Sequence, residues 1–146
     1  VTIVEPEGAN CIYRTAKAND GKLHTVKENL HTIMAGLCCG EPCSIGWKVL
    51  CDHADHFISE PDFAAATGMR VLGNPLPGDN KVVSGESGAA TLGFVFEVMC
   101  RPELEDMRKE IGLNEDSIVL CFSTEGDTDQ VNYRRIVWNG DWNSSK

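Results

Sequence analysis

Apolar runs of two kinds alternate along this chain and predict an α/β fold. Short runs rich in β-branched and aromatic residues occur at Val1–Glu5, His56–Glu60 and Ile118–Phe122, and each has the length of one strand. Between them lie longer stretches with apolar residues three or four positions apart, as in amphipathic helices. Strands separated by helices favour a mostly parallel sheet in a three-layer arrangement. Three strands make only part of such a sheet, so either this pattern misses further strands or the rest of the sheet belongs to residues outside this chain.

The helices are bounded by turn-forming residues. Ser44 is the expected N-cap of one helix, and Gly68 and Gly112 are expected to end two others. The expected helices are 8–18, 44–53, 62–67, 86–99, 103–111 and 130–138. Glycine, proline and asparagine between Arg70 and Ser84 predict a long loop, and the glycine-rich run His31–Gly40 is too irregular for either a helix or a plain strand. A polar tail is expected at 139–146.

Composition and charge narrow the class of partner. The chain has 146 residues, 42% of them hydrophobic, which is enough for one compact domain with a core. Its formal charge of −9, without any cluster of Lys and Arg, argues against binding nucleic acid or an anionic membrane. Neither a transmembrane segment nor a signal peptide is apparent, so a cytoplasmic setting is expected, with a small molecule or a protein as the partner. Val1 in place of an initiator Met leads us to expect that the chain is a piece of something longer.

The seven cysteines are expected to be mostly reduced, because several of them lie in apolar segments. Four of them lie near His53 and His56 and offer soft ligands for a metal. These four are Cys38, Cys39, Cys43 and Cys51. They contain no Cys-x-x-Cys pair, and adjacent cysteines chelate together poorly, so no metal site is predicted. A disulfide among them is favoured slightly over zinc.

Two short polar stretches are candidates for a ligand site. Ser123–Asp129 follows the apolar run Ile118–Phe122, where the carboxyl edge of a parallel sheet would bind a ligand. Ser84–Ala89 opens into an apolar helix, so its backbone N–H groups and the Glu86 carboxylate could face the same ligand. From the residues alone, the first stretch is better explained by a capped turn before a helix, and Glu86 by an acid favoured in a first helical turn.

The order of motifs resembles a known superfamily. The motifs are Val4–Glu7, Thr32–Leu37, Gly40–Glu41, Gly85–Ala89 and Phe122–Asp129. In this order and spacing they resemble the C-terminal part of the fold-type II pyridoxal-phosphate enzymes, the tryptophan synthase β and threonine dehydratase superfamily. Within it, Ala35–Trp47, Gly68–Pro75 and Ser123–Asp129 are most similar to the 2,3-diaminopropionate ammonia-lyase family. The resemblance covers nearly the whole chain, which would then be the C-terminal portion of a lyase domain.

The resemblance implies a role for particular residues. Ser123 matches the hydroxyl that hydrogen-bonds the pyridine nitrogen of pyridoxal 5'-phosphate in the superfamily, and Thr124 is its substitute if the register is shifted by one. Glu86 matches the acid beside the cofactor ring. Gly36 and Leu37 match the segment that lines the face of cofactor and substrate. The family eliminates ammonia from 2,3-diaminopropionate to give pyruvate and ammonia, and it is expected to act as a homodimer.

The superfamily's reactive lysine and glycine-rich phosphate loop have no match in this chain. None of the lysines of this chain lies in the sequence motif of the superfamily's reactive lysine. The lysines are residues 17, 22, 27, 48, 81, 109 and 146. The catalytic residues are therefore expected in an N-terminal part of the same polypeptide, and this chain alone is expected to be inactive. Two alternatives stay open, a serine or threonine dehydratase-like enzyme and a noncatalytic α/β ligand-binding module.

Overall fold

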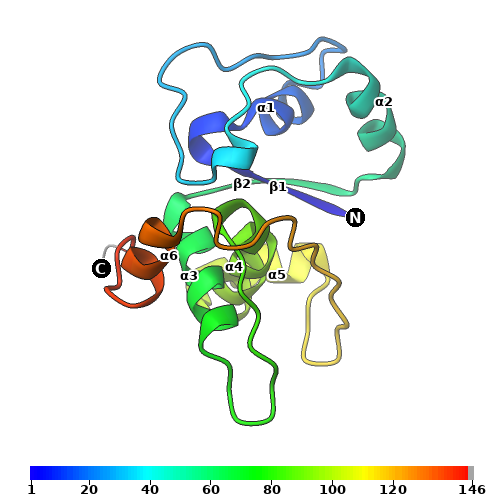
Figure 1. Ribbon diagram of the computed structural model, residues 1–146. Helices are drawn as coiled ribbons and strands as arrows, with labels where there is room; N and C mark the ends of the chain where they lie inside the picture. The colour runs from blue at the N-terminus through cyan, green and yellow to red at the C-terminus, as the bar shows by residue number, and fades with distance from the viewer. Residues whose placement is uncertain (145–146) are drawn as a thin grey trace. The chain divides into compact units, whose positions relative to one another are not determined.

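The chain folds as two compact units in the computed structural model, which describes residues 1–144 (Figure 1). One unit comprises Val1–Asp62 and the other begins at Phe63. Ser145 and Lys146, the end of the predicted polar tail, lie outside the described residues.

The first unit is built on two parallel strands. Strand β1 (Thr2–Pro6) pairs with β2 (His56–Glu60), with Thr2 opposite His56 and Pro6 opposite Glu60. The connection between them holds the 3-10 helices η1 (Glu7–Ala9) and η2 (Ala35–Leu37) and the α-helices α1 (Cys11–Ala18) and α2 (Ser44–His53). The predicted α/β class and parallel strand direction are confirmed.

Helix α1 begins three residues later than predicted, because a strand residue caps it. The Glu5 carboxylate accepts hydrogen bonds from the backbone N–H groups of Ile12 (3.1 Å) and Tyr13 (2.7 Å), which the helix itself cannot satisfy. Burial raises the pKa of Glu5, although these two hydrogen bonds oppose the shift. Glu5 thus ties the end of β1 to the start of α1.

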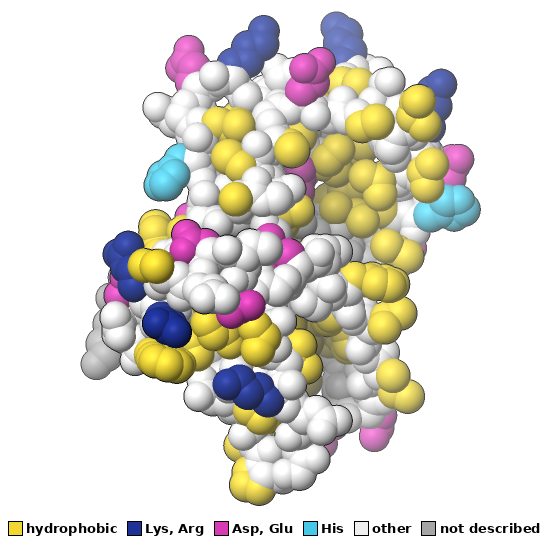
Figure 2. Space-filling view, viewed as in Figure 1, with side chains coloured by type: hydrophobic (Ala, Val, Ile, Leu, Met, Phe, Trp, Pro, Cys, Tyr) yellow, Lys and Arg dark blue, Asp and Glu magenta, His cyan; other side chains and the backbone are white. Residues whose placement is uncertain are grey.

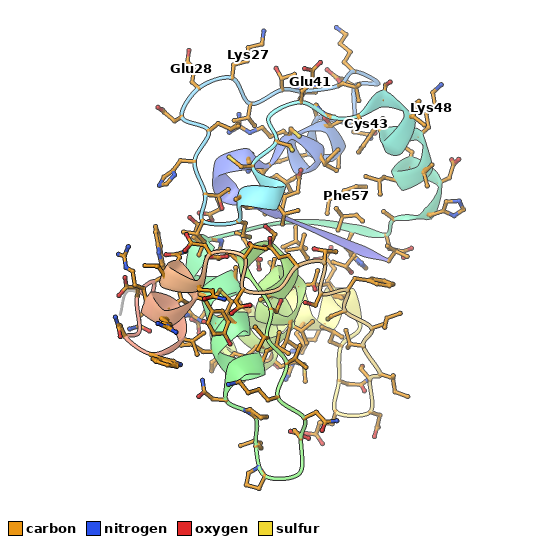
Figure 3. All side chains as sticks on the ribbon, viewed as in Figure 1. Lys27, Glu28, Glu41, Cys43, Lys48 and Phe57 are labelled. Atoms are coloured by element: carbon orange, nitrogen blue, oxygen red, sulfur yellow. The ribbon has the colours of Figure 1, made fainter. Side chains whose placement is uncertain are left out.

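Helix α2 is capped by Cys43, so the prediction of Ser44 as its N-cap is wrong. The Cys43 sulfur accepts a hydrogen bond from the Gly46 N–H at 3.5 Å, whereas Ser44 is the first helical residue. The Trp47 ring on this helix lies 5.7 Å from the ring of Phe57, whose side chain rises from β2 on the side of the unit's helices (Figure 3). Ile45 on the same helix is 76% exposed, and Figure 2 shows hydrophobic side chains at the surface where α2 lies.

The second unit is helical. Its α-helices are α3 (Asp62–Gly73, which starts at the last residue of the first unit), α4 (Glu86–Cys100), α5 (Glu105–Ile111) and α6 (Gln130–Val137), and the 3-10 helix η3 (Pro102–Leu104) precedes α5. The predicted position of each helix is confirmed to within a few residues at most ends. Gly112 ends α5 in the left-handed conformation with φ of 80°, as predicted.

Gly68 does not end helix α3, which continues to Gly73. A Cβ at Gly68 would lie 2.3 Å from the carbonyl oxygen of Ala89, and a Cβ at Gly93 would lie 2.0 Å from that of Ala64. The two glycines therefore allow the backbones of α3 and α4 to approach closely. Gly68, which the sequence pattern predicts to end the helix, is instead needed for close packing of the two helices.

The prediction of a buried strand at Ile118–Phe122 is wrong. This segment has no strand partner within residues 1–144, and Ile118 and Leu120 are 101% and 77% exposed. Its apolar, β-branched composition suits a pleated surface, but a strand also needs a neighbour that pairs with its backbone. The described part of the chain offers none, and the expected third strand of the sheet does not form.

The last described segment is held against α3 and α6. The Arg70 guanidinium donates hydrogen bonds to the carbonyl oxygens of Asp141 (3.0 Å) and Trp142 (3.4 Å), and the Asp141 N–H donates to the Arg135 carbonyl (3.0 Å).

None of the helices within residues 1–144 is long and apolar enough to cross a membrane.

Candidate cofactor site

The two polar stretches singled out in the sequence meet in the second unit. The Ser123 hydroxyl donates to Ser84 Oγ at 2.8 Å, and the Gly85 N–H donates to the Glu125 carbonyl at 3.1 Å. The Glu125 carboxylate accepts a hydrogen bond from the Ser87 N–H at 2.7 Å. Residues 123–125 are therefore bound side by side to the start of α4.

This close approach depends on the absence of a side chain at Gly85. A Cβ there would lie 2.5 Å from the carbonyl oxygen of Gly126 and 2.9 Å from Glu125 Cγ. Any other residue would push the loop away from α4, and the contact between Ser123 and Ser84 would be lost with it.

Ser123 is exposed, but the residue to which its hydroxyl is hydrogen-bonded is buried. Its side chain is exposed, whereas Ser84, to which it is bonded, is fully buried. A hydroxyl has one donor proton and two acceptor lone pairs, so Ser123 can bond a second group besides Ser84. Thr124, the alternative from sequence, is also exposed and follows directly.

Glu86 is bonded to helix α6. Its carboxylate accepts a hydrogen bond from the side-chain amide of Asn132, and Glu86 itself is buried. Asp129 accepts a hydrogen bond from the Asn132 N–H at 3.0 Å and caps α6, which confirms the capping alternative for this residue. Glu86 lies in the first turn of α4, where a negative charge is favoured by the helix dipole.

The start of α4 is not open to a ligand at Ser87. The expectation that the backbone N–H groups of this stretch face a ligand fails there, because Glu125 already accepts the Ser87 N–H. A carboxylate supplied by the chain occupies the position that an anionic ligand would take at a helix N-terminus. A phosphate group is therefore not expected to bind at this N–H.

Gly36 and Leu37 lie in η2 of the first unit. The segment before them is anchored by Asp62, whose carboxylate accepts hydrogen bonds from the Thr32 hydroxyl and from the Ile33 N–H, the latter at 3.1 Å. Gly36 is exposed and Leu37 is half-buried. Their predicted role in lining a ligand stays a prediction.

The cysteines are free and no metal cluster is formed in the described part of the chain. All seven cysteines are unpaired, with Cys39, Cys43 and Cys51 exposed, so the disulfide alternative is not realised. Within residues 1–144, no group of three His, Cys, Asp or Glu side chains could hold a metal ion.

Three residues of this site were not singled out from the sequence. Ser84 and Glu125 belong to the two polar stretches. Their spacing in the sequence does not show that Ser84 bonds to the second stretch or that Glu125 bonds to the first. Asn132 lies on a face of α6 that its amphipathic pattern predicts to be polar, without indicating a partner. Their contacts join residues 38 to 46 positions apart, so only the folded chain brings them together.

Comparison with known proteins gives these residues a context. No model of a known protein family matches the chain. The chain is 49% identical over 138 residues to diaminopropionate ammonia-lyase of Escherichia coli strain K12, and 45% identical over 141 residues to that of Salmonella typhimurium strain LT2. The chain is homologous to one part of the diaminopropionate ammonia-lyases. The match covers 94% and 96% of this chain but 34% and 35% of the two lyases.

A solved structure of a lyase agrees with the fold. The crystal structure of the Escherichia coli lyase, in complex with an aminoacrylate–PLP azomethine reaction intermediate, matches with a TM-score of 0.87 and 46% identity. The alignment covers 97% of this chain and 35% of the lyase chain. The resemblance stated from the motifs is confirmed, and the chain spans about a third of the length of the lyases that it matches.

The residues of the site fit one portion of pyridoxal phosphate. Ser123 offers an exposed hydroxyl that can bond an aromatic ring nitrogen, and Ser84 and Glu125 hold it in place. The phosphate group is not expected at the start of α4, because the Ser87 N–H is already bonded to the Glu125 carboxylate. The fit is thus to the ring end of the cofactor.

Proposed function

We propose that this chain is the part of a pyridoxal-phosphate-dependent ammonia-lyase that forms one wall of its cofactor site. The observation that carries the proposal is the 49% identity over 138 residues to diaminopropionate ammonia-lyase. The full enzyme would convert 2,3-diaminopropionate and water to pyruvate and ammonia. Bound pyridoxal phosphate supplies the electron sink that such an elimination needs.

The chain's own residues have positioning roles in this proposal. Ser123 bonds the ring nitrogen, with Thr124 as its substitute, and the contact with Ser84 supports this role. Glu86 lies beside the ring in this proposal, and its carboxylate is held by the hydrogen bond from Asn132. Gly36 and Leu37 line the face of cofactor and substrate. None of these residues is assigned the proton transfer, which belongs to a lysine elsewhere in the same polypeptide.

Further properties of the full enzyme follow from the same proposal. The full enzyme has the type II fold of pyridoxal-phosphate enzymes, lies in the cytoplasm and forms a homodimer in this proposal. The N-terminal part of the same polypeptide would supply the reactive lysine, the glycine-rich phosphate loop and the strands that pair with Ile118–Phe122. The exposed apolar side chains of that segment support the last point, since they suit a pleated and buried surface.

The full natural polypeptide that carries this chain tests the proposal directly. With pyridoxal phosphate, it should release pyruvate and ammonia from 2,3-diaminopropionate faster than from serine or threonine at equal concentration. Faster release from serine or threonine would favour a dehydratase. Ligand binding without release from any of the three would favour a noncatalytic binding module.

Residues 1–146 alone provide the second test. We expect no pyruvate from them and no absorbance of a lysine-bound cofactor, because the reactive lysine lies elsewhere. Absorbance that is lost when one of the seven lysines is replaced would contradict the assignment of this lysine to another part of the polypeptide.

A further inference from the structure

Ser84 is a buried hydroxyl that enters the proposed function only as the hydrogen-bond partner of Ser123. The side chain is 0% exposed, and its Oγ lies 2.8 Å from Ser123 Oγ and 3.2 Å from the Gly85 carbonyl oxygen. These three oxygens form a hydrogen-bonded row that starts at the exposed Ser123 and ends inside the second unit.

Ser123 Oγ also lies 3.4 Å from the Glu125 carbonyl oxygen, a longer contact than the one to Ser84. Two proton arrangements of the row leave Ser123 able to bond a ligand. In the first, Ser123 donates to Ser84 and Ser84 donates to Gly85, which leaves Ser123 free to accept a hydrogen bond from a ligand N–H. In the second, Ser84 donates a hydrogen bond to Ser123, and Ser123 donates a hydrogen bond to a ligand nitrogen that carries no proton. The Gly85 carbonyl stays satisfied in the second arrangement, because it also accepts the Ala89 N–H at 3.0 Å.

The backbone around Ser84 leaves its hydroxyl little freedom to turn elsewhere. A Cβ at Gly88 would lie 2.7 Å from Ser84 Oγ, so the first turn of α4 passes directly against it. The Gly85 N–H is fixed on the Glu125 carbonyl on the other side. The Ser84 oxygen is therefore held where Ser123 can reach it.

We propose that Ser84 is a positioning residue for Ser123, which fixes the Ser123 oxygen and either accepts or donates the hydrogen bond between the two hydroxyls, according to the protonation of the cofactor's ring nitrogen. This inference rests on the proposed function of Ser123 as the partner of that nitrogen. Ser84 is not assigned any contact with the cofactor, so its effect must pass through Ser123.

A double-mutant cycle in the full natural polypeptide tests this dependence. The variants are S84A, S123A and the two combined, and the readouts are the dissociation constant of pyridoxal phosphate and the resonance of its ¹⁵N-labelled ring nitrogen. Loss of one hydrogen bond should weaken binding by S84A about three- to tenfold. The ring-nitrogen resonance should shift as well. In the S123A background, S84A should cause no further change in either readout.

The matched control is T91V, which removes a buried hydroxyl from helix α4, the helix that follows Ser84. Thr91 Oγ1 is buried and has no hydrogen-bond partner within residues 1–144, so this change should leave both readouts at their wild-type values. An S84A effect that is absent, or equally large with and without Ser123, would overturn the inference.

The outcomes separate this inference from the proposed function. If S123A itself leaves the dissociation constant and the resonance unchanged, the role proposed for Ser123 fails, and this inference fails with it. If S123A changes both and S84A changes neither, only the inference about Ser84 fails. Should S84A not fold, a crystal structure of the cofactor-loaded wild type decides: the two Oγ atoms should lie in hydrogen-bond contact, and a separation above about 3.5 Å would overturn the inference.

Discussion

The Glu125 carboxylate accepts a hydrogen bond from the backbone N–H of Ser87 at 2.7 Å, so a loop residue caps helix α4 from 38 positions further along the chain. This bond, with that between the Gly85 N–H and the Glu125 carbonyl, fastens the loop that carries Ser123. The cap and the position of the candidate cofactor contact therefore depend on one residue.

Replacing Glu125 by alanine should lower the free energy of unfolding by about 1–2 kcal/mol, because an N-terminal N–H of α4 loses its acceptor. Glu125→Gln should cost less, since it keeps an oxygen acceptor and loses only the charge favoured by the helix dipole. Urea unfolding of the full natural polypeptide measures both. Glu115→Ala, at an exposed loop position, is the control. Equal losses for Glu125→Ala and Glu115→Ala would contradict the capping role.

Gly68→Ala should destabilise the second unit by about 1–3 kcal/mol, because the new Cβ would meet the Ala89 carbonyl at 2.3 Å and force α3 and α4 apart. The same substitution at Gly46 is a matched control. A Cβ there meets only the Cys43 side chain at 3.6 Å, so Gly46→Ala should stabilise by about 0.5–1 kcal/mol. Thermal unfolding midpoints that shift in the same direction for both variants would refute the packing argument.

Cys43 and Cys11 should differ sharply in reactivity with iodoacetamide at pH 7. Hydrogen bonds from the N–H groups of Gly46 and Ile45 lower the pKa of the exposed Cys43. Burial, followed by the nearby Glu5 carboxylate, raises the pKa of Cys11 to about 11. Because the thiolate is the reactive form, Cys43 should be alkylated faster by on the order of a hundredfold.

Peptide mapping by mass spectrometry after short exposures measures the two rates. Cys43→Ser serves as the control, because it should remove the fast-labelled position and leave the slow rate at Cys11 unchanged. Comparable rates at the two cysteines in the unmodified chain would show that the environments described for them do not persist in solution.

The free energy of unfolding of Glu5→Gln, minus that of the wild type, should increase as pH rises. Burial raises the folded-state pKa of Glu5 above its ordinary value of 4.5. The stability that the protonated form contributes is therefore fully present below that ordinary value. That contribution is lost as pH rises through the raised pKa, while glutamine stays neutral throughout. The measurement is the difference in free energy of unfolding between variant and wild type from pH 4 to pH 7. A difference that falls over this range would mean that the pKa of Glu5 is lowered instead.

The sequence predicted much of the local structure because its signals are local. The strands at 1–5 and 56–60 and the helix that starts at Glu86 were indicated by residue spacing and turn chemistry, and the structure confirms them. The lyase resemblance likewise followed from the order of short motifs. Ser123 and Glu86 were found in this way, although their contact with a cofactor stays a proposal.

By itself, then, the sequence determined the α/β class, the positions of most helices and the kinship with the lyases, since periodicity, caps and motif order are written into neighbouring residues. Only the tertiary structure decided that Gly68 continues a helix, that Ile118–Phe122 has no strand partner in the described chain, and that Ser84 supports Ser123 from 39 positions away. Each of these depends on which backbone or side chain comes to lie opposite, and that is set by packing between distant segments.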